Sequence, residues 1–371
     1  MEFSTSKADL LKELTLTQWV VERKTTIPIL SNLLFEVEDS TLRISATDLD
    51  LGIRCGCPAK VIDGGSGTVP AKRLFEIVRS LPDAEVHFKL LENHWVHLTC
   101  ARSSFKLVGM ARDNFPVLPA IPKPVAALPA AVCSAMMQKT IFAISSEESR
   151  YTLNGALLLM KPESASMVAT DGHRLALVER DAQVEGLKSE LRVLIPKKAM
   201  AELLRLVSEA GEETLIELSK DESHLFFQVG SRVLISRMLT GQFPNYEAVL
   251  PRENTRVVEL DRDQTAAAIR RVALLADERS RAIRMQVDKD RVEIFSSSGE
   301  YGEAHETLDA SYDKESMQIG FNYQYLLDFM GVVGEGGKIR LELKDEQSAG
   351  QLRPAEQGPY RYRYVVMPMR I

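Results

Sequence analysis

VPAKRLFEIVRSL (residues 69–81) has apolar residues at helical spacing, and two later segments of the chain match it. They are IPKKAMAELLRLV (195–207) and FNYQYLLDFMGVV (321–333), and each begins 126 residues after the one before. The apolar positions keep one register in all three copies, as Leu74, Met200 and Leu326 illustrate. Three in-register copies in 371 residues predict three units of about 124 residues, each large enough to have its own core.

The composition is that of a globular protein, with 45% hydrophobic and 26% charged residues, so each unit can bury a core. The N-terminal MEFSTSKADL lacks a signal-peptide pattern, and no apolar run approaches the ~20 residues that span a bilayer. Four cysteines without a CxxC pair do not make a disulfide framework, so we expect reduced thiols. We therefore expect a soluble, cytoplasmic protein.

Two breaks separate the predicted units. The proline-rich stretch FPVLPAIPKPVAALPAA (115–131) suits an extended connector, because proline fixes φ and cannot donate to a strand ladder. A second break falls at FPNYEAVLPRENTR (243–256). The predicted domains are residues 1–122, 123–251 and 252–371.

Periodicity predicts that each unit is α+β and strand-rich, with two helices. Helical spacing occurs in KADLLKEL (7–14), AMMQKTIFAI (135–144) and DQTAAAIRRVALLA (263–276), the last with Asp261 or Asp263 as an N-cap. Short alternating runs of β-branched or aromatic residues predict strands. These runs are TLRISATDL (41–49), HLFFQVG (224–230), RVLISRML (232–239) and RVEIFSS (291–297).

Enzyme signatures are not met. GVVGEGGKI (331–339) is not a phosphate-binding loop, because Val332 takes the place of the first glycine and Ile339 follows Lys338. DGGSGT (63–68) is interpreted as a turn. His94 and His97, three apart in a strand-like stretch, would lie on opposite faces, which argues against a shared metal. We expect no catalytic residue, metal or cofactor.

ATDGHRLAL (169–177) leaves one alternative open. Its Asp171 and His173 could form an acid–base or metal site in a repeat-built enzyme or small-ligand protein. Asp171 and Gly172 more often form a turn, with His173 and Arg174 projecting beyond it. The partial echo ATDLDLGI (46–53) in the first unit supports this structural interpretation.

Several motifs in a fixed order resemble one known family, the bacterial DNA polymerase III beta subunit or sliding clamp. They are TIPILSNLLFEV (26–37), ATDLDL (46–51), TVPAKRLFEIVR (68–79), YTLNGALL (151–158), ATDGHRLAL (169–177), FPNYEAVLP (243–251), IGFNYQYLLD (319–328) and VVMPMRI (365–371). The resemblance implies three tandem clamp domains and a non-enzymatic homodimer closed head to tail into a ring, with helices lining the hole and sheets outside. Such a ring encircles double-stranded DNA and gives processivity to its partners, the DNA polymerase III catalytic subunit, the clamp loader and other clamp-motif proteins.

The resemblance also implies a dimer interface. One side would be the strand SFKLVG (104–109), with Phe105 and Leu107 as apolar contacts. The other side would hold Leu274 and Leu275, flanked by the acidic residues Glu300, Glu303 and Glu306.

The net charge of −6 does not exclude DNA binding, because affinity for a duplex follows the local placement of Lys and Arg. Two pairs of cations begin repeated helices, where the helix dipole disfavours positive charge. The resemblance implies that these cations face the hole. The implied DNA-binding residues are Arg23, Lys24, Lys72, Arg73, Arg150, Tyr151, Lys197 and Lys198, with Arg270 and Arg271 nearby.

A pocket for short glutamine- and leucine-containing segments of partners is implied between the second and third domains. Its walls would be Leu153, Thr170, Gly172, His173, Arg174, Leu175, Pro244, Val249, Asn322, Tyr325, Val365, Val366, Met367, Pro368, Met369 and Arg370. The chain departs from the family's pattern at Ala248, Ser280, Gln347 and Ala349, which puts the peptide preference in question.

Overall fold

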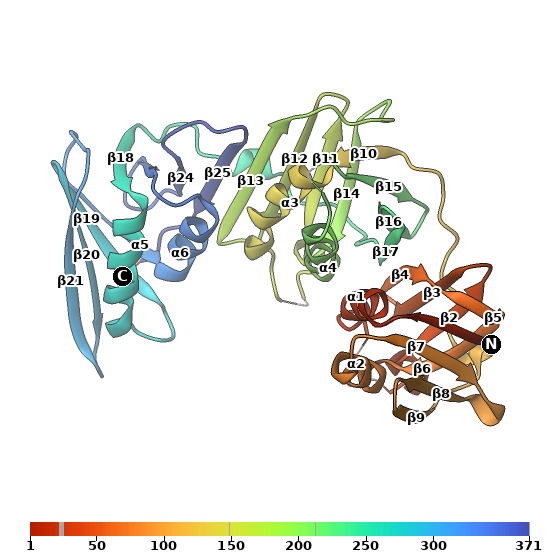
Figure 1. Cartoon of the computed structure of the whole chain (residues 1–371). Coiled ribbons are helices and arrows are strands. Elements are labelled where there is room, and N and C mark those ends of the chain that lie inside the picture. Colours follow the sequence, from red (N-terminus) through yellow and green to blue (C-terminus); the bar gives the residue numbers. More distant parts are fainter. Residues whose placement is uncertain (22–25, 148, 212, 371) are drawn as a thin grey trace. The chain divides into compact units, whose positions relative to one another are not determined.

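The computed structural model describes residues 1–21, 26–147, 149–211 and 213–370 (Figure 1). The chain forms two compact units. The first unit contains Met1–Cys133 and Lys198–Met238, and the second contains Ser134–Lys197 and Leu239–Ile371. The division passes through the middle repeat, because each unit has a sheet that combines strands of two neighbouring repeats.

Each repeat contains two strand–helix pairs in which the helix begins directly after the strand (Figure 1). In the first repeat, β1 (Glu2–Ser6) leads into α1 (Lys7–Thr17), and β6 (Gly65–Pro70) leads into α2 (Ala71–Ser80). In the second, β10 (Ala126–Pro129) leads into α3 (Ala130–Gln138), and β14 (Leu191–Pro196) leads into α4 (Lys197–Ser208). In the third, β18 (Arg256–Asp261) leads into α5 (Arg262–Val272), and β22 (Met317–Asn322) leads into α6 (Tyr323–Val332). The predicted α+β repeat with two helices is confirmed.

Local chemistry explains where several helices begin. Ser6 accepts a hydrogen bond from the backbone N–H of Asp9, Asp261 accepts one from Gln264, and Asn322 accepts one from Gln324. Each side chain satisfies a donor that the first helical turn leaves free. The in-register residues Leu74, Met200 and Leu326 of α2, α4 and α6 are all buried, as the shared apolar register predicts.

The first unit has two antiparallel sheets. One has the order β5-β1-β7-β8-β9 and the other β10-β15-β16-β17-β4-β3-β2-β6. Their further strands are β2 (Asn32–Glu38), β3 (Thr41–Thr47), β4 (Leu51–Pro58), β5 (Lys60–Asp63), β7 (Glu85–Leu90), β8 (Trp95–Cys100), β9 (Ser103–Val108), β15 (Leu215–Lys220), β16 (His224–Val229) and β17 (Arg232–Arg237). Helices α1 and α2 contact one another beside them.

Pairing of β4 with β17 joins the first repeat to the second inside this unit. A buried ion pair reinforces the junction: Arg232 of β17 donates to Glu13 of α1 at 2.6 Å and to Glu209 at 3.0 Å. The core of the first repeat is built around Phe3, which stacks on Phe88 at 5.0 Å between ring centroids. Backbone pairing, rather than a flexible link, therefore connects these repeats.

The second unit also has two antiparallel sheets. Their orders are β14-β11-β12-β13-β25-β24-β23-β18 and β21-β20-β19-β22. Their further strands are β11 (Gly155–Lys161), β12 (Ser164–Thr170), β13 (Arg174–Asp181), β19 (Ala282–Asp288), β20 (Arg291–Ser298), β21 (Gly302–Asp309), β23 (Lys338–Leu343), β24 (Gly350–Pro354) and β25 (Arg361–Val366). Pairing of β13 with β25 joins the second repeat to the third, and Phe329 of α6 stacks on Tyr362 and Tyr364 of β25, each at 5.4 Å.

Short 3-10 helices occupy several connections. They are η1 (Pro28–Ser31), η2 (Glu92–His94), η3 (Arg112–Asn114), η4 (Ile141–Ala143), η5 (Tyr151–Leu153), η6 (Tyr246–Ala248) and η7 (Ala273–Leu275). Among the described residues, no helix is both long enough and apolar enough to cross a membrane.

Four local predictions need correction. The helix predicted at residues 135–144 begins at Ala130 and ends at Gln138, before η4. The proline-rich connector contains β10, which pairs with β15. DGGSGT is not only a turn, because β6 begins at Gly65. His94 lies in η2 with a φ of 63°, so only His97 belongs to a strand.

Candidate functional site

The turn between β12 and β13 is built by its own side chains. Asp171 Oδ1 accepts the backbone N–H groups of His173 and Arg174, each at 3.0 Å. Thr170 Oγ1 donates to the Arg174 carbonyl at 2.6 Å and accepts from the Gly172 N–H at 3.1 Å. Gly172 has a φ of 90°, a conformation that glycine adopts without strain. The Asp171 carboxylate is thus used in shaping the turn, as the structural interpretation predicts.

The first repeat has the same turn between β3 and β4. Asp48 Oδ1 accepts from the N–H groups of Asp50 and Leu51 at 3.0 and 2.6 Å, and Thr47 Oγ1 donates to the Leu51 carbonyl at 2.9 Å. Leu49 takes the place of Gly172, with a φ of 82°. Two copies of one hydrogen-bonding pattern identify the motif as a structural feature of the repeat.

Arg174 does not project from this turn, contrary to the sequence prediction. Its side chain is 11% exposed and contacts both the second and the third repeat. It donates to Asp171 at 3.0 Å, to Asp328 of α6, and to the Phe142 carbonyl at 2.6 Å. Its guanidinium also lies 4.4 Å from the ring centre of Tyr325. Although burial opposes the charge, the nearby Tyr364, Asp328 and Asp171 raise the pKa of Arg174.

The C-terminal tail is hydrogen-bonded on both sides. Val365 and Val366 are buried in β25, opposite Leu175 and Arg174 of β13. After the strand ends, the Met367 N–H donates to the His173 carbonyl at 2.9 Å, and the Met369 N–H donates to the Gly320 carbonyl at 2.8 Å. Two of the predicted pocket residues, Val365 and Val366, are therefore part of a sheet, whereas Met367 is 44% exposed.

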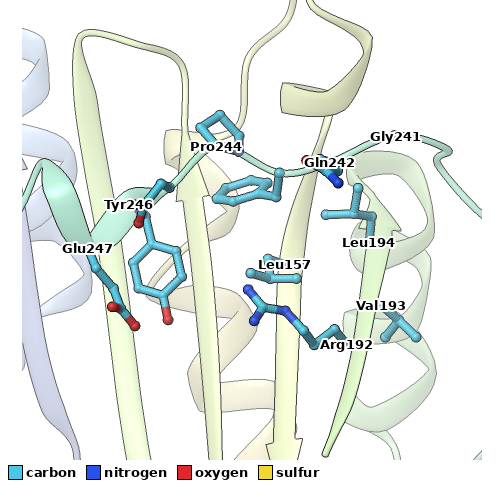
Figure 2. Close-up of a pocket in the computed structure, with 11 residues that line it drawn as sticks. Leu157, Arg192, Val193, Leu194, Gly241, Gln242, Pro244, Tyr246 and Glu247 are labelled. Carbon is cyan, nitrogen blue, oxygen red and sulfur yellow. The ribbon is translucent and has the colours of Figure 1, made fainter.

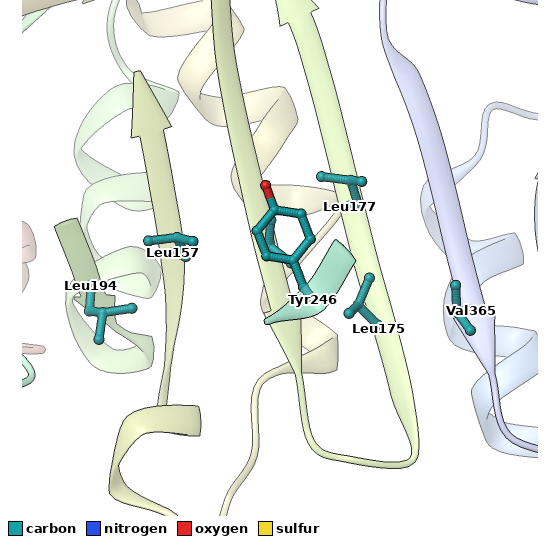
Figure 3. Close-up of a cluster of buried hydrophobic side chains, with 7 residues drawn as sticks. Leu157, Leu175, Leu177, Leu194, Tyr246 and Val365 are labelled. Carbon is teal, nitrogen blue, oxygen red and sulfur yellow. The ribbon is translucent and has the colours of Figure 1, made fainter. Parts of the chain in front are cut away.

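Beneath the predicted pocket lies a hydrophobic cluster (Figure 3). Tyr246 of η6 covers Leu175 and Leu177 of β13, and Val365 of β25 belongs to the same cluster. Phe243 and Leu250 pack against it from the loop around η6. Val249 in that loop is 47% exposed, and Pro244 and His173 are exposed. Exposed apolar groups above a firm apolar floor can bind apolar side chains of a peptide.

Two cavities adjoin these residues. The first, of about 520 Å³, is lined by Leu157, Arg192, Leu194, Pro244, Tyr246 and Glu247, among others (Figure 2). The second, of about 340 Å³, is lined by Arg284, Gln318, Gln347, Pro368, Met369 and Arg370, among others. Sequence reasoning named Pro244 at the first cavity, and Gln347 and the tail at the second. Arg192, Tyr246, Glu247, Arg284 and Gln318 were missed, because neighbouring motifs do not reveal which loop covers which strand.

The remaining predicted pocket residues lie near α6 and η5. Tyr325 is half-buried. Burial is the main cause that raises the pKa of its phenol, and the negative charge of Asp171 raises this pKa further. Asn322 caps α6 with its side chain, so its amide oxygen is already used. Leu153 is half-buried at the end of η5.

The predicted DNA-binding cations lie where the repeated helices begin. Lys72 and Arg73 are exposed in the first turn of α2, and Lys197 and Lys198 are exposed in the first turn of α4. Tyr151 is 49% exposed in η5. Arg23 and Lys24 lie outside the described residues. The matching turn of α6 begins with Tyr323 and Gln324 and has no cation.

Several of these cations have partners within the chain. Lys198 pairs with Asp48 in the turn of the first repeat, Arg73 pairs with Glu76 at 3.0 Å, and Arg150 pairs with Glu147 at 2.9 Å. The Arg73 and Arg150 pairs are exposed and contribute only about 0–1 kcal/mol each, so phosphates can replace these partners. Lys198 is exposed too, but the side chain of its partner Asp48 is only 5% exposed. Arg150 also donates to the Asp171 carbonyl at 2.7 Å, which ties it to the β12–β13 turn.

The predicted interface residues lie beside two sheet edges. Phe105 and Leu107 are half-buried on β9, which pairs only with β8 within the described residues. Leu274 is 78% exposed in η7, which contacts the edge strand β21. Leu275 is half-buried and Glu300 and Glu303 are exposed, whereas Glu306 pairs with Arg271.

The described residues contain no group of three or more His, Cys, Asp or Glu side chains placed to hold a metal ion. The four cysteines are free and buried. Burial raises the pKa of the Cys57 thiol to about 11 and that of Cys133 to about 12, so these thiols are protonated at neutral pH.

Comparison with known proteins follows the same three-part division. Models of the DNA polymerase III beta subunit match residues 1–119 with its N-terminal domain, residues 127–245 with its central domain and residues 247–370 with its C-terminal domain. The chain belongs to the DNA polymerase III beta subunit family. A beta sliding clamp of Caulobacter vibrioides is 38% identical over 388 residues, and one of Pseudomonas aeruginosa is 34% identical over 377 residues. Both alignments cover 100% of each chain.

Solved sliding clamps have the same fold. The DNA polymerase sliding clamp of Pseudomonas aeruginosa, crystallised with a ligand, superposes with a TM-score of 0.93 at 33% identity. That of Caulobacter crescentus superposes with a TM-score of 0.92 at 36% identity. Both comparisons cover 100% of each chain. The chain is accordingly a processivity factor of DNA replication and not an enzyme.

Proposed function

We propose that two copies of this chain join head to tail into a closed ring that encircles duplex DNA and tethers the replicative polymerase. The observation that carries the proposal is the pair of edge strands β9 and β21, each beside exposed or half-buried apolar residues. An unpaired strand edge is a template for another chain. Contact between two different surfaces must close into a ring or continue as a filament.

The proposed interface joins β9 of one copy to β21 of the next. Phe105 and Leu107 would meet Leu274 and Leu275, and the exposed carboxylates Glu300 and Glu303 would lie at the rim. Leu274 supports this proposal, because a leucine side chain 78% exposed contributes little to the fold of its own unit.

The proposed DNA-facing surface consists of the cations at the helix starts. Lys72, Arg73, Lys197 and Lys198 are exposed in the first turns of α2 and α4, and Lys72 and Lys198 occupy equivalent positions of the two repeats. Arg150 and Tyr151 extend this surface, and Arg23 and Lys24 complete the proposed set. Weak, salt-sensitive contacts are sufficient for a ring that holds DNA topologically.

The proposed partner site is the surface above the Tyr246 cluster. Exposed Val249, Met367 and Pro244 would bind the apolar side chains of a short segment, while Gly172 and His173 would bind its backbone. Its partners would be the DNA polymerase III catalytic subunit, the clamp loader and other clamp-motif proteins.

We propose three domains, residues 1–122, 123–251 and 252–371, and a cytoplasmic location, where a bacterial chromosome is replicated.

Retention on DNA tests the ring. Purified chain should remain on nicked circular DNA after clamp loading and should leave when the circle is cut to a linear duplex. The double variant Lys198→Glu, Arg150→Glu should still be retained on circles, with a salt dependence of direct DNA binding reduced by about one unit of slope per lost phosphate contact. Equal loss from circular and linear DNA would reject encirclement, and an unchanged salt slope would reject the proposed surface.

No observation favours the enzyme or small-ligand alternative. Asp171 is held by two backbone N–H groups and Arg174, and the same turn recurs in the first repeat without a histidine.

A further inference from the structure

A second kind of site lies at the junction of the first and second repeats. A cavity of about 570 Å³ is lined by Glu36, Arg43, Arg54, Ile121 and Val233, among others. This volume falls within the range of small-ligand sites. Cys55 of β4 points towards α1, because its thiol approaches the Glu13 carbonyl at 4.0 Å. Since side chains alternate along a strand, the neighbouring Arg54 faces away from α1.

Glycine keeps the floor of this cavity open. Gly56 follows Cys55 on β4, opposite Arg43 of β3. A Cβ atom at this position would lie 2.5 Å from the carbonyl oxygen of Leu42, so a side chain cannot be accommodated without moving the backbone. The space beside Arg43 therefore stays free.

Two guanidinium groups in the cavity have unused donors. Arg43 is exposed and makes no ion pair or hydrogen bond with any residue that the structure describes. Arg54 is half-buried, and one of its five donors reaches the Leu118 carbonyl at 2.9 Å. Burial lowers the pKa of Arg54, Glu36 opposes this effect and Arg43 adds to it. Glu36 itself pairs with Arg112 at 3.4 Å. An additional negative group would relieve the repulsion between the two arginines.

The second unit provides an internal comparison. Its β12–β13 turn matches the β3–β4 turn hydrogen bond for hydrogen bond, which aligns Arg43 with Ser166 and Arg54 with Leu177. Leu177 is buried beneath Tyr246 in the hydrophobic cluster (Figure 3). The same place in the fold is therefore stable without any arginine, so the two arginines of the first unit are not required by the sheet.

We propose that this cavity binds a carboxylate-bearing segment of a partner polypeptide, with an acidic side chain between Arg43 and Arg54 and an adjacent aliphatic side chain against Ile121 and Val233. The apolar wall favours a peptide over a free anion, since Ile121 is 38% exposed and Val233 belongs to an apolar cluster that Leu118 packs against. A nucleic-acid backbone binds through contacts between several phosphates and several cations. This cavity offers only Arg43 and Arg54, with the carboxylate of Glu36 beside them, so it does not suit a nucleic acid. The proposal does not depend on ring closure or on DNA binding.

A short synthetic peptide tests the site. Acetyl-isoleucyl-glutamyl-isoleucyl-amide is titrated into the full-length chain and followed by ligand-observed NMR. We expect a Kd of about 1 mM at low salt and about tenfold weaker binding of the glutaminyl analogue, because a charge-assisted hydrogen bond to the carboxylate is lost. Glutarate and a short DNA duplex are titrated in parallel and should bind more weakly than the peptide.

Arg43→Ala and Arg54→Lys should each weaken the peptide at least about threefold, and Arg43→Ala should leave thermal unfolding unchanged because that side chain is exposed and unpaired. Arg237→Ala is the matched control, since Arg237 is an exposed arginine of β17 outside this cavity. The proposal is overturned if the peptide and its glutaminyl analogue bind equally, or if neither binds. Unaltered binding to Arg43→Ala, or tighter binding of glutarate or DNA, would also overturn it.

Discussion

Replacing Arg174 with alanine should weaken the junction between the second and third repeats more than any exposed substitution. The guanidinium is 11% exposed and holds Asp171, Asp328 and the Phe142 carbonyl, with Tyr325 stacked 4.4 Å away. Breaking a buried ion pair costs about 3–5 kcal/mol, because a buried charge loses its partner. Asp171 and Asp328 are 17% and 22% exposed, so water can replace part of the contact. We expect a loss of about 3 kcal/mol.

The assay must report on the second unit. Both tryptophans, Trp19 and Trp95, lie in the first unit, so their fluorescence does not follow this junction. Hydrogen exchange of the β13 and β25 amides reports on this junction, because these two strands pair across it. Exchange of these amides should accelerate by about 100-fold in Arg174→Ala, while the β4 and β17 amides keep their wild-type rates.

Two further variants make the result interpretable. Arg174→Lys retains the charge but not the planar fork, so its effect should fall between wild type and alanine. Arg180→Ala removes another β13 arginine, which lies 4.8 Å from the Tyr360 ring, and should cost less than about 1 kcal/mol. A loss below about 1 kcal/mol for Arg174→Ala would refute the view that this residue holds the junction together.

Three other outcomes are expected. Leu274→Ala combined with Leu275→Ala should shift the dimer towards monomer in sedimentation, through lost apolar burial, and a stable wild-type monomer at micromolar concentration would contradict the interface. Truncation after Met367 keeps β25 and should lower the affinity of a clamp-motif peptide about tenfold, with little change in the unfolding temperature. Normal peptide binding by the truncated chain would show that the tail is not part of the peptide site. Burial, only partly offset by Arg205, raises the pKa of Glu202 in the folded state. Its stabilising contribution is therefore present at acidic pH and lost as pH rises through that pKa. In urea titrations, Glu202→Gln should therefore gain stability relative to wild type as the pH rises from the acidic range towards neutral, and a pH-independent difference would refute this.

The repeat and its helices could be predicted from the sequence because the signals are local. Helices α2, α4 and α6 begin directly after Pro70, Pro196 and Asn322, where the apolar periodicity starts. The β12–β13 turn was also predictable, since Asp171 and Gly172 form it with their own side chain and backbone.

Contacts between distant residues could not be predicted in this way. Asp328 lies 154 residues after Arg174 in the chain, so the projecting arginine of the prediction is in fact a buried link. The strand β10 was hidden by the prolines before it and by its own Pro129, which pairs with Leu215 at the edge of a sheet. The tail residues Val365 and Val366 look like a free end in the sequence, but they are covered because β13 supplies hydrogen-bonding partners.

The pairing of β4 with β17 has a consequence for synthesis on the ribosome. When the first repeat emerges, the ladder of β4 is completed on one side by β3, while its other side awaits Arg232–Arg237, which are made only near the end of the second repeat. An edge that stays open during translation can recruit the wrong strand, including the same strand of another nascent chain. Arg54 lies on that edge, and a charged side chain there discourages such pairing until β17 arrives.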